Sequence, residues 1–158
     1  MPRLFLVLCS LLFAPLVLAT SLTEGQMIDP LQLSDQHGRP GKIDSATRLV
    51  LFSRDMKANK LAKAAFMDRA ADYLGTAGTV YLIDVSPMPR FVTRTFAIPK
   101  MQKYGYRIYL DREGADSAAF PSQKGRITAI HLEGLKVTRV EYVDSATALT
   151  TLVEGRKP

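Results

Sequence analysis

The fold of this chain is decided by the stretch Leu49-Val50-Leu51-Phe52-Ser53-Arg54-Asp55-Met56. Its first five residues form a continuous apolar run that ends in a serine. A short run of this kind, placed after a polar loop, is typical of a strand buried on both faces of a sheet. Asp55 then offers a carboxylate that can cap a helix. The stretch therefore predicts a central strand followed directly by a helix.

An apolar residue at every fourth position predicts the length of that helix. This stripe consists of Ala58, Ala62, Phe66, Ala70 and Leu74. A spacing of four places such residues on one helical face, which is expected to cover the sheet. The glycine-containing stretch 75–78 ends the predicted helix. The apolar run 79–85 then predicts a second strand, parallel to the first because a helix crossover joins parallel neighbours.

The flanking segments predict the rest of a mixed sheet. Residues 25–33 are extended and run into a turn at 35–41, which predicts an N-terminal hairpin. Ser86 is expected to cap a helix with Phe91, Val92, Phe96 and Met101 on its apolar face, and Pro99 to kink or split it. Strands are predicted over 106–111, 126–132 and 137–143, with Ser145 capping a last helix. Together they predict an α/β fold.

This order of elements resembles the thioredoxin-like fold, in the version of the peroxiredoxin and thiol-specific antioxidant group. Three phrases carry the resemblance. Residues 30–38 resemble its opening strand and turn, residues 49–53 its central strand, and residues 109–114 a strand that ends in Asp with Gly soon after. The resemblance implies a three-layer α/β/α sandwich with a mixed central sheet and an N-terminal β-hairpin. It also implies an active site where the central strand meets the following helix.

The chain departs from this family at the active site. Thioredoxins carry C-x-x-C there, and the thiolate, activated by the helix N-terminus, is the nucleophile. This chain has one cysteine, Cys9, far from that junction. The family's cysteine positions fall on Ser53 and Met56, or on Lys57 and Lys60, depending on the alignment. The peroxiredoxin phrase Pro-x-x-x-Thr/Ser-x-x-Cys is absent as well. Thiol–disulfide exchange and peroxidase activity are therefore not expected.

The chain also resembles small exported proteobacterial proteins that are sometimes labelled FAD/FMN-containing dehydrogenases. A dinucleotide-binding fold needs a glycine-rich phosphate loop between a strand and a helix. No G-x-G-x-x-G occurs anywhere in the sequence. We therefore predict no flavin and no other cofactor.

The N-terminus predicts export. Arg3 precedes a nearly uninterrupted apolar run, Leu4 to Leu18, and Val17-Leu18-Ala19 suits a signal peptidase. We expect cleavage after Ala19, a single domain over 20–158, and a periplasmic or secreted protein without stable membrane insertion. An uncleaved N-terminal anchor is the alternative.

The net positive charge of the chain, and the way it is distributed, indicate which classes of partner to expect. The chain carries 21 Lys and Arg against 15 Asp and Glu, a formal charge of +6. The basic residues are scattered, so nucleic-acid binding has no support. A periplasmic or envelope protein, or an anionic surface, is the expected partner.

A candidate binding surface follows from the position of the lost active site. It comprises Ser53, Arg54, Asp55, Met56, Lys57, Lys60 and Met88. Arg54, Lys57 and Lys60 could hold an anion at the helix N-terminus. A set of Ser53, His131 and Asp84 could support hydrolysis only if the fold assembled it. The methionines favour core packing over a copper site, and no metal site is expected. Two hypotheses follow, a redox-inactive binding or accessory domain and an enzyme with a non-thiol mechanism or a bound cofactor.

Overall fold

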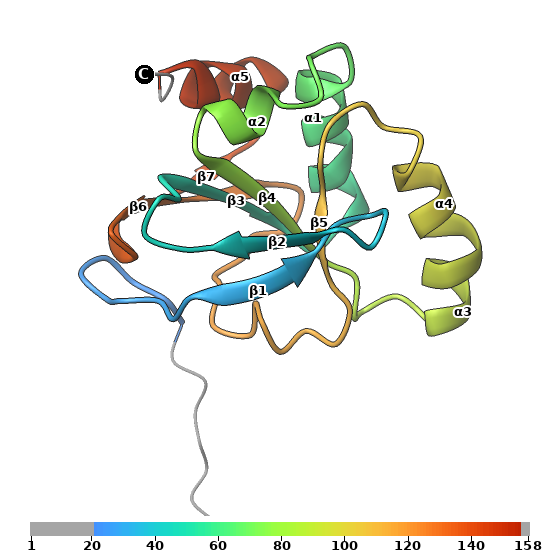
Figure 1. The fold of residues 1–158 in the computed structure, drawn as a ribbon, viewed down its shortest axis with the longest axis horizontal. Coiled ribbons are helices and arrows are strands. Elements are labelled where there is room, and N and C mark those ends of the chain that lie inside the picture. Colours follow the sequence, from blue (N-terminus) through green and yellow to red (C-terminus); the bar gives the residue numbers. More distant parts are fainter. Residues whose placement is uncertain (1–20, 156–158) are drawn as a thin grey trace, which may run out of the picture.

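The computed structural model describes residues 21–155, so the predicted signal peptide lies outside the described residues. Figure 1 shows its helices and strands. The strands are β1 (Leu31–Ser34), β2 (Pro40–Ile43), β3 (Leu49–Ser53), β4 (Thr79–Asp84), β5 (Tyr109–Asp111), β6 (Ile127–Glu133) and β7 (Lys136–Val143). The helices are α1 (Met56–Phe66), α2 (Tyr73–Thr76), α3 (Arg90–Val92), the π-helical turn η1 (Thr93–Ala97), α4 (Ile98–Met101) and α5 (Ala146–Glu154). Within residues 21–155, no helix has the length and apolar character needed to cross a membrane.

The five-stranded sheet is mixed, as the sequence predicts. Its strand order is β5-β4-β3-β6-β7. Strands β3, β4 and β5 run parallel, while β6 is antiparallel to β3 and to β7. Strands β1 and β2 form a separate antiparallel hairpin, with Leu31 opposite Ile43. The predicted α/β class, central strand and N-terminal hairpin are confirmed.

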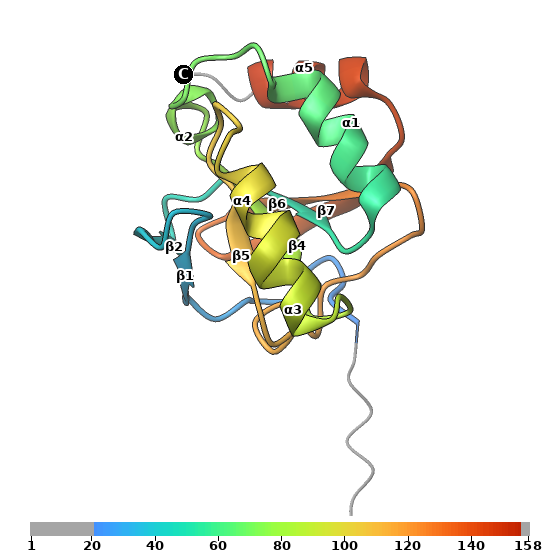
Figure 2. The ribbon, with the colours of Figure 1, turned by 90° about the vertical axis from the view of Figure 1, so that its right-hand side faces the viewer.

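Each face of the sheet buries its own core, because side chains alternate along a strand. Leu49 and Leu51 of β3 face the core that contains the buried residues of α1, α4 and α5. Val50 and Phe52 face the second core, which is closed by the β1–β2 hairpin, the segment around Leu22 and the loop around Phe120. Figures 1 and 2 show α1 and α5 together on one side of the sheet and the hairpin on the other. The second outer layer of the predicted sandwich is thus built from the hairpin and loops.

The first predicted helix is wrong in length. It ends at Phe66, and α2 begins at Tyr73 after a turn in which Ala70 is exposed. The ring of Tyr73 packs back on Phe66 with centroids 6.0 Å apart. In a continuous helix, residues seven apart lie about 10.5 Å apart along the axis. Closing this aromatic cluster therefore requires the chain to break out of the helix.

The second predicted helix differs at its start and at Pro99. Ser86 is not its cap: the Ser86 N–H donates to Asp84 Oδ1, and α3 begins at Arg90 behind Pro89. Pro99 does not split the helix. The turn before it widens into η1, where the Ile98 N–H bonds the Thr93 carbonyl, five residues back. A wide turn of this kind lets the helix pass a residue that has no N–H to donate. The predicted caps of the other two helices, Asp55 and Ser145, are confirmed.

Candidate functional site

The carboxyl ends of β3, β4 and β5 form one edge of the sheet, where the family resemblance places the active site. They end at Ser53, Asp84 and Asp111, all of them buried. In open α/β sheets this is the edge at which ligands bind. A ligand at this edge could contact only those groups that are not already bonded within the fold.

Ser53 lies beneath the surface instead of on it. Its Oγ is 2.5 Å from Asn59 Oδ1 and 3.1 Å from the Tyr81 hydroxyl. Tyr81 donates to the same Asn59 oxygen at 3.0 Å. Burial raises the pKa of Tyr81 far above its ordinary value, so the hydroxyl keeps its proton and its donor role. Ser53 therefore holds the start of α1 against β4.

The structure does not assemble Ser53, His131 and Asp84. His131 lies opposite Leu49, four residues before Ser53, which is about 13 Å along the strand. The imidazole Nε2 is 2.6 Å from Glu141 Oε1 on the neighbouring strand, and Asp84 faces Arg54. The hydrolytic alternative is wrong on geometry.

Arg54 lies across the sheet edge and is held from three sides. Its Nε is 3.1 Å from Asp84 Oδ2, an ion pair that lacks the alignment of a hydrogen bond. Its Nη2 donates to the Ser117 carbonyl at 3.4 Å, and its guanidinium stands over the Phe52 ring, 5.2 Å from the centroid. Arg54 is thus an internal link between β4 and the loop after β5.

Asp111 organises that loop. Its Oδ1 accepts the N–H groups of Glu113 and Gly114 at 3.3 and 2.7 Å. Its Oδ2 accepts the N–H and hydroxyl of Ser117 at 2.8 and 2.7 Å. The carboxylate therefore fixes the loop that presents the Ser117 carbonyl to Arg54.

The N-terminus of α1 is filled by the protein's own carboxylate. Asp55 Oδ1 accepts the N–H groups of Lys57 and Ala58, and Oδ2 accepts the N–H of Gly125 at 2.9 Å. Two of the first-turn N–H groups that would attract an external anion, those of Lys57 and Ala58, already have an acceptor. Met56, at 70 % exposure, projects into solvent beside this cap.

The geometry favours Lys57 and Lys60 as the counterparts of a C-x-x-C pair. A reactive thiol must be accessible and near a helix N-terminus. Lys57 and Lys60 are exposed in the first two turns of α1, whereas Ser53 is buried in a strand. The Lys57 side chain also lies against Gly125, in the loop before β6.

Met88 lines a cleft that continues this edge beyond β4 and β5. The cleft has a volume of about 610 Å³ and is lined by Val85, Ser86, Met88, Arg90, Thr93, Arg94, Arg112 and Glu113. Arg90 is paired with Glu113 at 2.8 Å. Arg94 and Arg112 have no acidic partner within the described part of the chain. The cleft is therefore cationic and open.

Arg94 and Arg112 are absent from the predicted surface. Arg112 directly follows a strand that ends at the functional edge, so its position in the sequence could have placed it there. Arg94 needs the unusual turn η1 to reach the cleft, and nothing in the sequence signals that turn.

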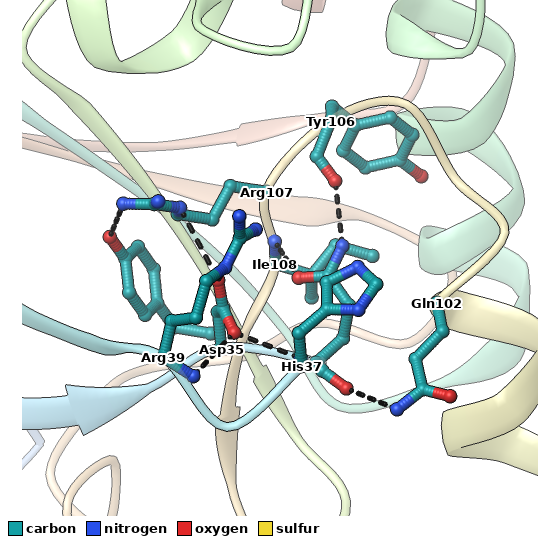
Figure 3. Close-up of polar contacts among 9 residues, drawn as sticks. Asp35, His37, Arg39, Gln102, Tyr106, Arg107 and Ile108 are labelled. Atoms are coloured by element: carbon teal, nitrogen blue, oxygen red, sulfur yellow. Dashed lines mark hydrogen bonds and ion pairs between the residues drawn. The ribbon is translucent and has the colours of Figure 1, made fainter.

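A second polar cluster lies at the β1–β2 turn (Figure 3). The fully buried Asp35 carboxylate accepts the N–H groups of His37 and Arg39, and the Nε atoms of Arg39 and Arg107 lie 2.8 and 3.4 Å from Oδ2. Gln36 joins this turn to the segment just before β5: its side chain accepts from the Ile108 N–H and donates to the Tyr106 carbonyl. A cavity of about 340 Å³ opens here, also lined by Asp72. Because Asp35 and Asp72 offset its arginines, this cavity suits an anion less well than the cleft.

We expect this cluster to make stability depend on pH. Burial opposes ionisation of Asp35, but the N–H groups of Arg39 and His37 and the Arg39 guanidinium outweigh it and lower the pKa. A lowered pKa stabilises the fold above the ordinary value of 3.8, and that stability is lost as pH falls through the folded-state pKa. In urea unfolding, Asp35→Asn should be less stable than wild type at neutral pH by about 1–3 kcal/mol. The deficit should shrink at about pH 3. Asp29→Asn, at an exposed position, is the control, and equal deficits at both pH values would contradict the assignment.

Within residues 21–155, no three His, Cys, Asp or Glu side chains are grouped as metal ligands would be.

The comparisons with known proteins show the fold. No family model matches the chain, and no curated protein is similar at the sequence level. A solved putative protein disulfide isomerase from Bacteroides thetaiotaomicron is similar, with a TM-score of 0.54, 13 % identity, and coverage of 85 % of this chain and 87 % of that one. A peroxidoxin from Mycobacterium tuberculosis is similar with a TM-score of 0.51 and 16 % identity, and the match covers 82 % of this chain and 94 % of that one. An uncharacterized thioredoxin-like protein from Porphyromonas gingivalis is similar with a TM-score of 0.51 and 13 % identity, and the match covers 86 % of this chain and 94 % of that one. The fold is thioredoxin-like.

Proposed function

We propose that this thioredoxin-like chain is a redox-inactive binding protein that recognises an anionic group of a partner through the cleft at the ends of β4 and β5. The proposed binding site lies at the edge of the sheet where the family resemblance places the active site. In place of a reactive sulfur, the junction of β3 and α1 carries groups that bond one another, and the neighbouring cleft carries arginines.

One observation carries the proposal: the polar groups of the old active site are used internally, whereas Arg94 and Arg112 beside it are not. Ser53 and Asp55 have partners within the fold, and Arg54 is held by Asp84. The two cleft arginines face a hollow of about 610 Å³ and have no acidic partner within residues 21–155. Guanidinium groups bind carboxylates and phosphates in bidentate geometry. Met88 adds an apolar wall for the adjoining part of the partner.

The proposed setting is the bacterial envelope, supported by the N-terminal sequence. An apolar leader with a small-residue cleavage site directs a chain to export. We propose an acidic segment of an envelope protein as the partner, because a carboxylate cluster suits two arginines that line one cleft together with the apolar Met88.

Site-specific crosslinking in cells tests the proposal. A photoreactive amino acid replaces Met88, and the same residue replaces Ser45 as an exposed control position. We expect a discrete adduct from position 88 alone, reduced at least about tenfold when Arg94→Glu and Arg112→Glu are introduced, because each reversal turns an attraction into a repulsion. The matched reversal Lys136→Glu with Arg139→Glu, on β7 at the opposite edge of the sheet, should leave the adduct intact. An adduct insensitive to the cleft reversals, or no adduct, would count against the proposal.

A further inference from the structure

The outer side of the α3–η1–α4 segment exposes a set of large apolar side chains. Phe91 and Phe96 are 70 % and 61 % exposed, and Val92 is 39 % exposed. Single exposed apolar residues are ordinary on protein surfaces, whereas a contiguous group on one element marks an interaction site. Figure 2 looks directly at this segment, which stands at the front of the molecule.

The π-helical turn brings the two phenylalanines together. In a regular α-helix, residues five apart point in directions about 140° apart. The i→i+5 bonding of η1 widens the turn and moves such residues toward the same side. The rings of Phe91 and Phe96 consequently meet edge to face, with centroids 6.1 Å apart.

The segment that carries this apolar pair has only basic charged residues, two of which, Arg90 and Arg107, pair with Glu113 and Asp35 of other segments. From residue 85 to residue 110 the sequence contains no Asp or Glu, and it contains five basic residues, Arg90, Arg94, Lys100, Lys103 and Arg107. Lys100 and Lys103 are exposed and have no ion-pair partner in the described range 21–155. Phe96 lies in η1, Lys100 lies in α4, and Lys103 follows two residues after α4 ends at Met101. Exposed apolar rings and unpaired ammonium groups therefore belong to one segment, residues 91–103, whose exposed side forms the candidate face.

We propose that this face docks on the surface of an anionic lipid bilayer. The phenylalanine rings would enter the boundary between headgroups and acyl chains, and Lys100 and Lys103 would contact lipid phosphates. A second copy of the chain fits the face less well, because it would bring the same positive charges into contact. The inference is independent of the proposed cleft, since neither lysine nor either phenylalanine lines it.

A single-tryptophan variant tests the docking, because the chain contains no tryptophan. Phe96→Trp keeps an aromatic ring in the face, and its fluorescence emission reports the surroundings of that ring in the full-length protein. Met27→Trp is the matched control, since Met27 is 63 % exposed and pairs with Lys136 at the opposite sheet edge. The probes are vesicles of phosphatidylcholine alone or mixed with an equal part of phosphatidylglycerol.

We expect the emission of Phe96→Trp to shift to the blue with the mixed vesicles only, and Met27→Trp to stay unchanged. Adding Lys100→Glu and Lys103→Glu should raise the lipid concentration for half-maximal shift at least about tenfold. Raising the salt from about 0.1 M to about 1 M should also raise the lipid concentration for half-maximal shift, because salt screens the attraction between the lysines and the lipid phosphates. No shift, or an equal shift in both tryptophan variants, would overturn the inference. A blue shift that grows with protein concentration without lipid would also overturn it, because a second copy would then cover the face.

Discussion

The variant Asp111→Ala is expected to lose about 4 kcal/mol of unfolding free energy. The buried carboxylate accepts four donors, from Glu113, Gly114 and twice from Ser117. Each such bond is worth about 1 kcal/mol net, and a buried donor left unpaired costs more. The loop after β5 would also release the carbonyl that Arg54 contacts.

Urea unfolding at neutral pH measures this loss. Asp111→Asn keeps one acceptor oxygen and should lose about half as much. The control is Glu113→Ala in the same loop, where an exposed ion pair with Arg90 is broken and a change within about 1 kcal/mol is expected. A loss for Asp111→Ala no larger than the control's would show that the loop is held by other contacts.

Introducing Lys57→Cys with Lys60→Cys is expected to create thiol–disulfide exchange activity at the start of α1, above the level of the unaltered chain. Both positions are exposed at the start of α1, and a helix N-terminus lowers the pKa of a thiol and favours the reactive thiolate. Reduction of insulin disulfides by dithiothreitol in the presence of each protein measures the gain.

The matched control is Ser53→Cys with Met56→Cys, which has the same spacing and the same number of new thiols. Its first cysteine would be buried beneath Asn59 and Tyr81, so it should stay near the wild-type background. Cys9 is common to all three proteins and cancels in the comparison. Equal activity of the two double variants would contradict the assignment of Lys57 and Lys60.

The sequence predicts elements well where one physical signal dominates. The apolar run from Leu49 to Phe52 lies in β3, which ends at the following Ser53, and Asp55 and Ser145 bond the N–H groups that a cap should bond. It predicts poorly where tertiary packing overrides periodicity. Ala70 continues the helical stripe, yet the aromatic contact between Phe66 and Tyr73 ends the helix before it.

The candidate site, too, is predicted only in the part that depends on position in the chain and not on tertiary packing. Position in the chain places Ser53 at the functional edge, but whether a hydroxyl faces solvent depends on Asn59 and Tyr81, which lie on other elements. The predicted Met88 does line the cleft. Its arginine partners come from η1 and from the residue after β5, and only the folded chain brings them together.

Asp55 supplies a fixed negative charge at the N-terminus of α1. A thiolate at a helix N-terminus places a negative charge beside unpaired N–H groups. That charge stabilises the helix whether or not the sulfur also acts as a nucleophile. The Asp55 carboxylate supplies the same charge to Lys57, Ala58 and Gly125 as a tethered ligand, at an effective concentration that a free anion does not reach. The N-terminus of α1 is therefore neutralised without an external ligand, and this end of the helix stays closed whatever anions surround the protein.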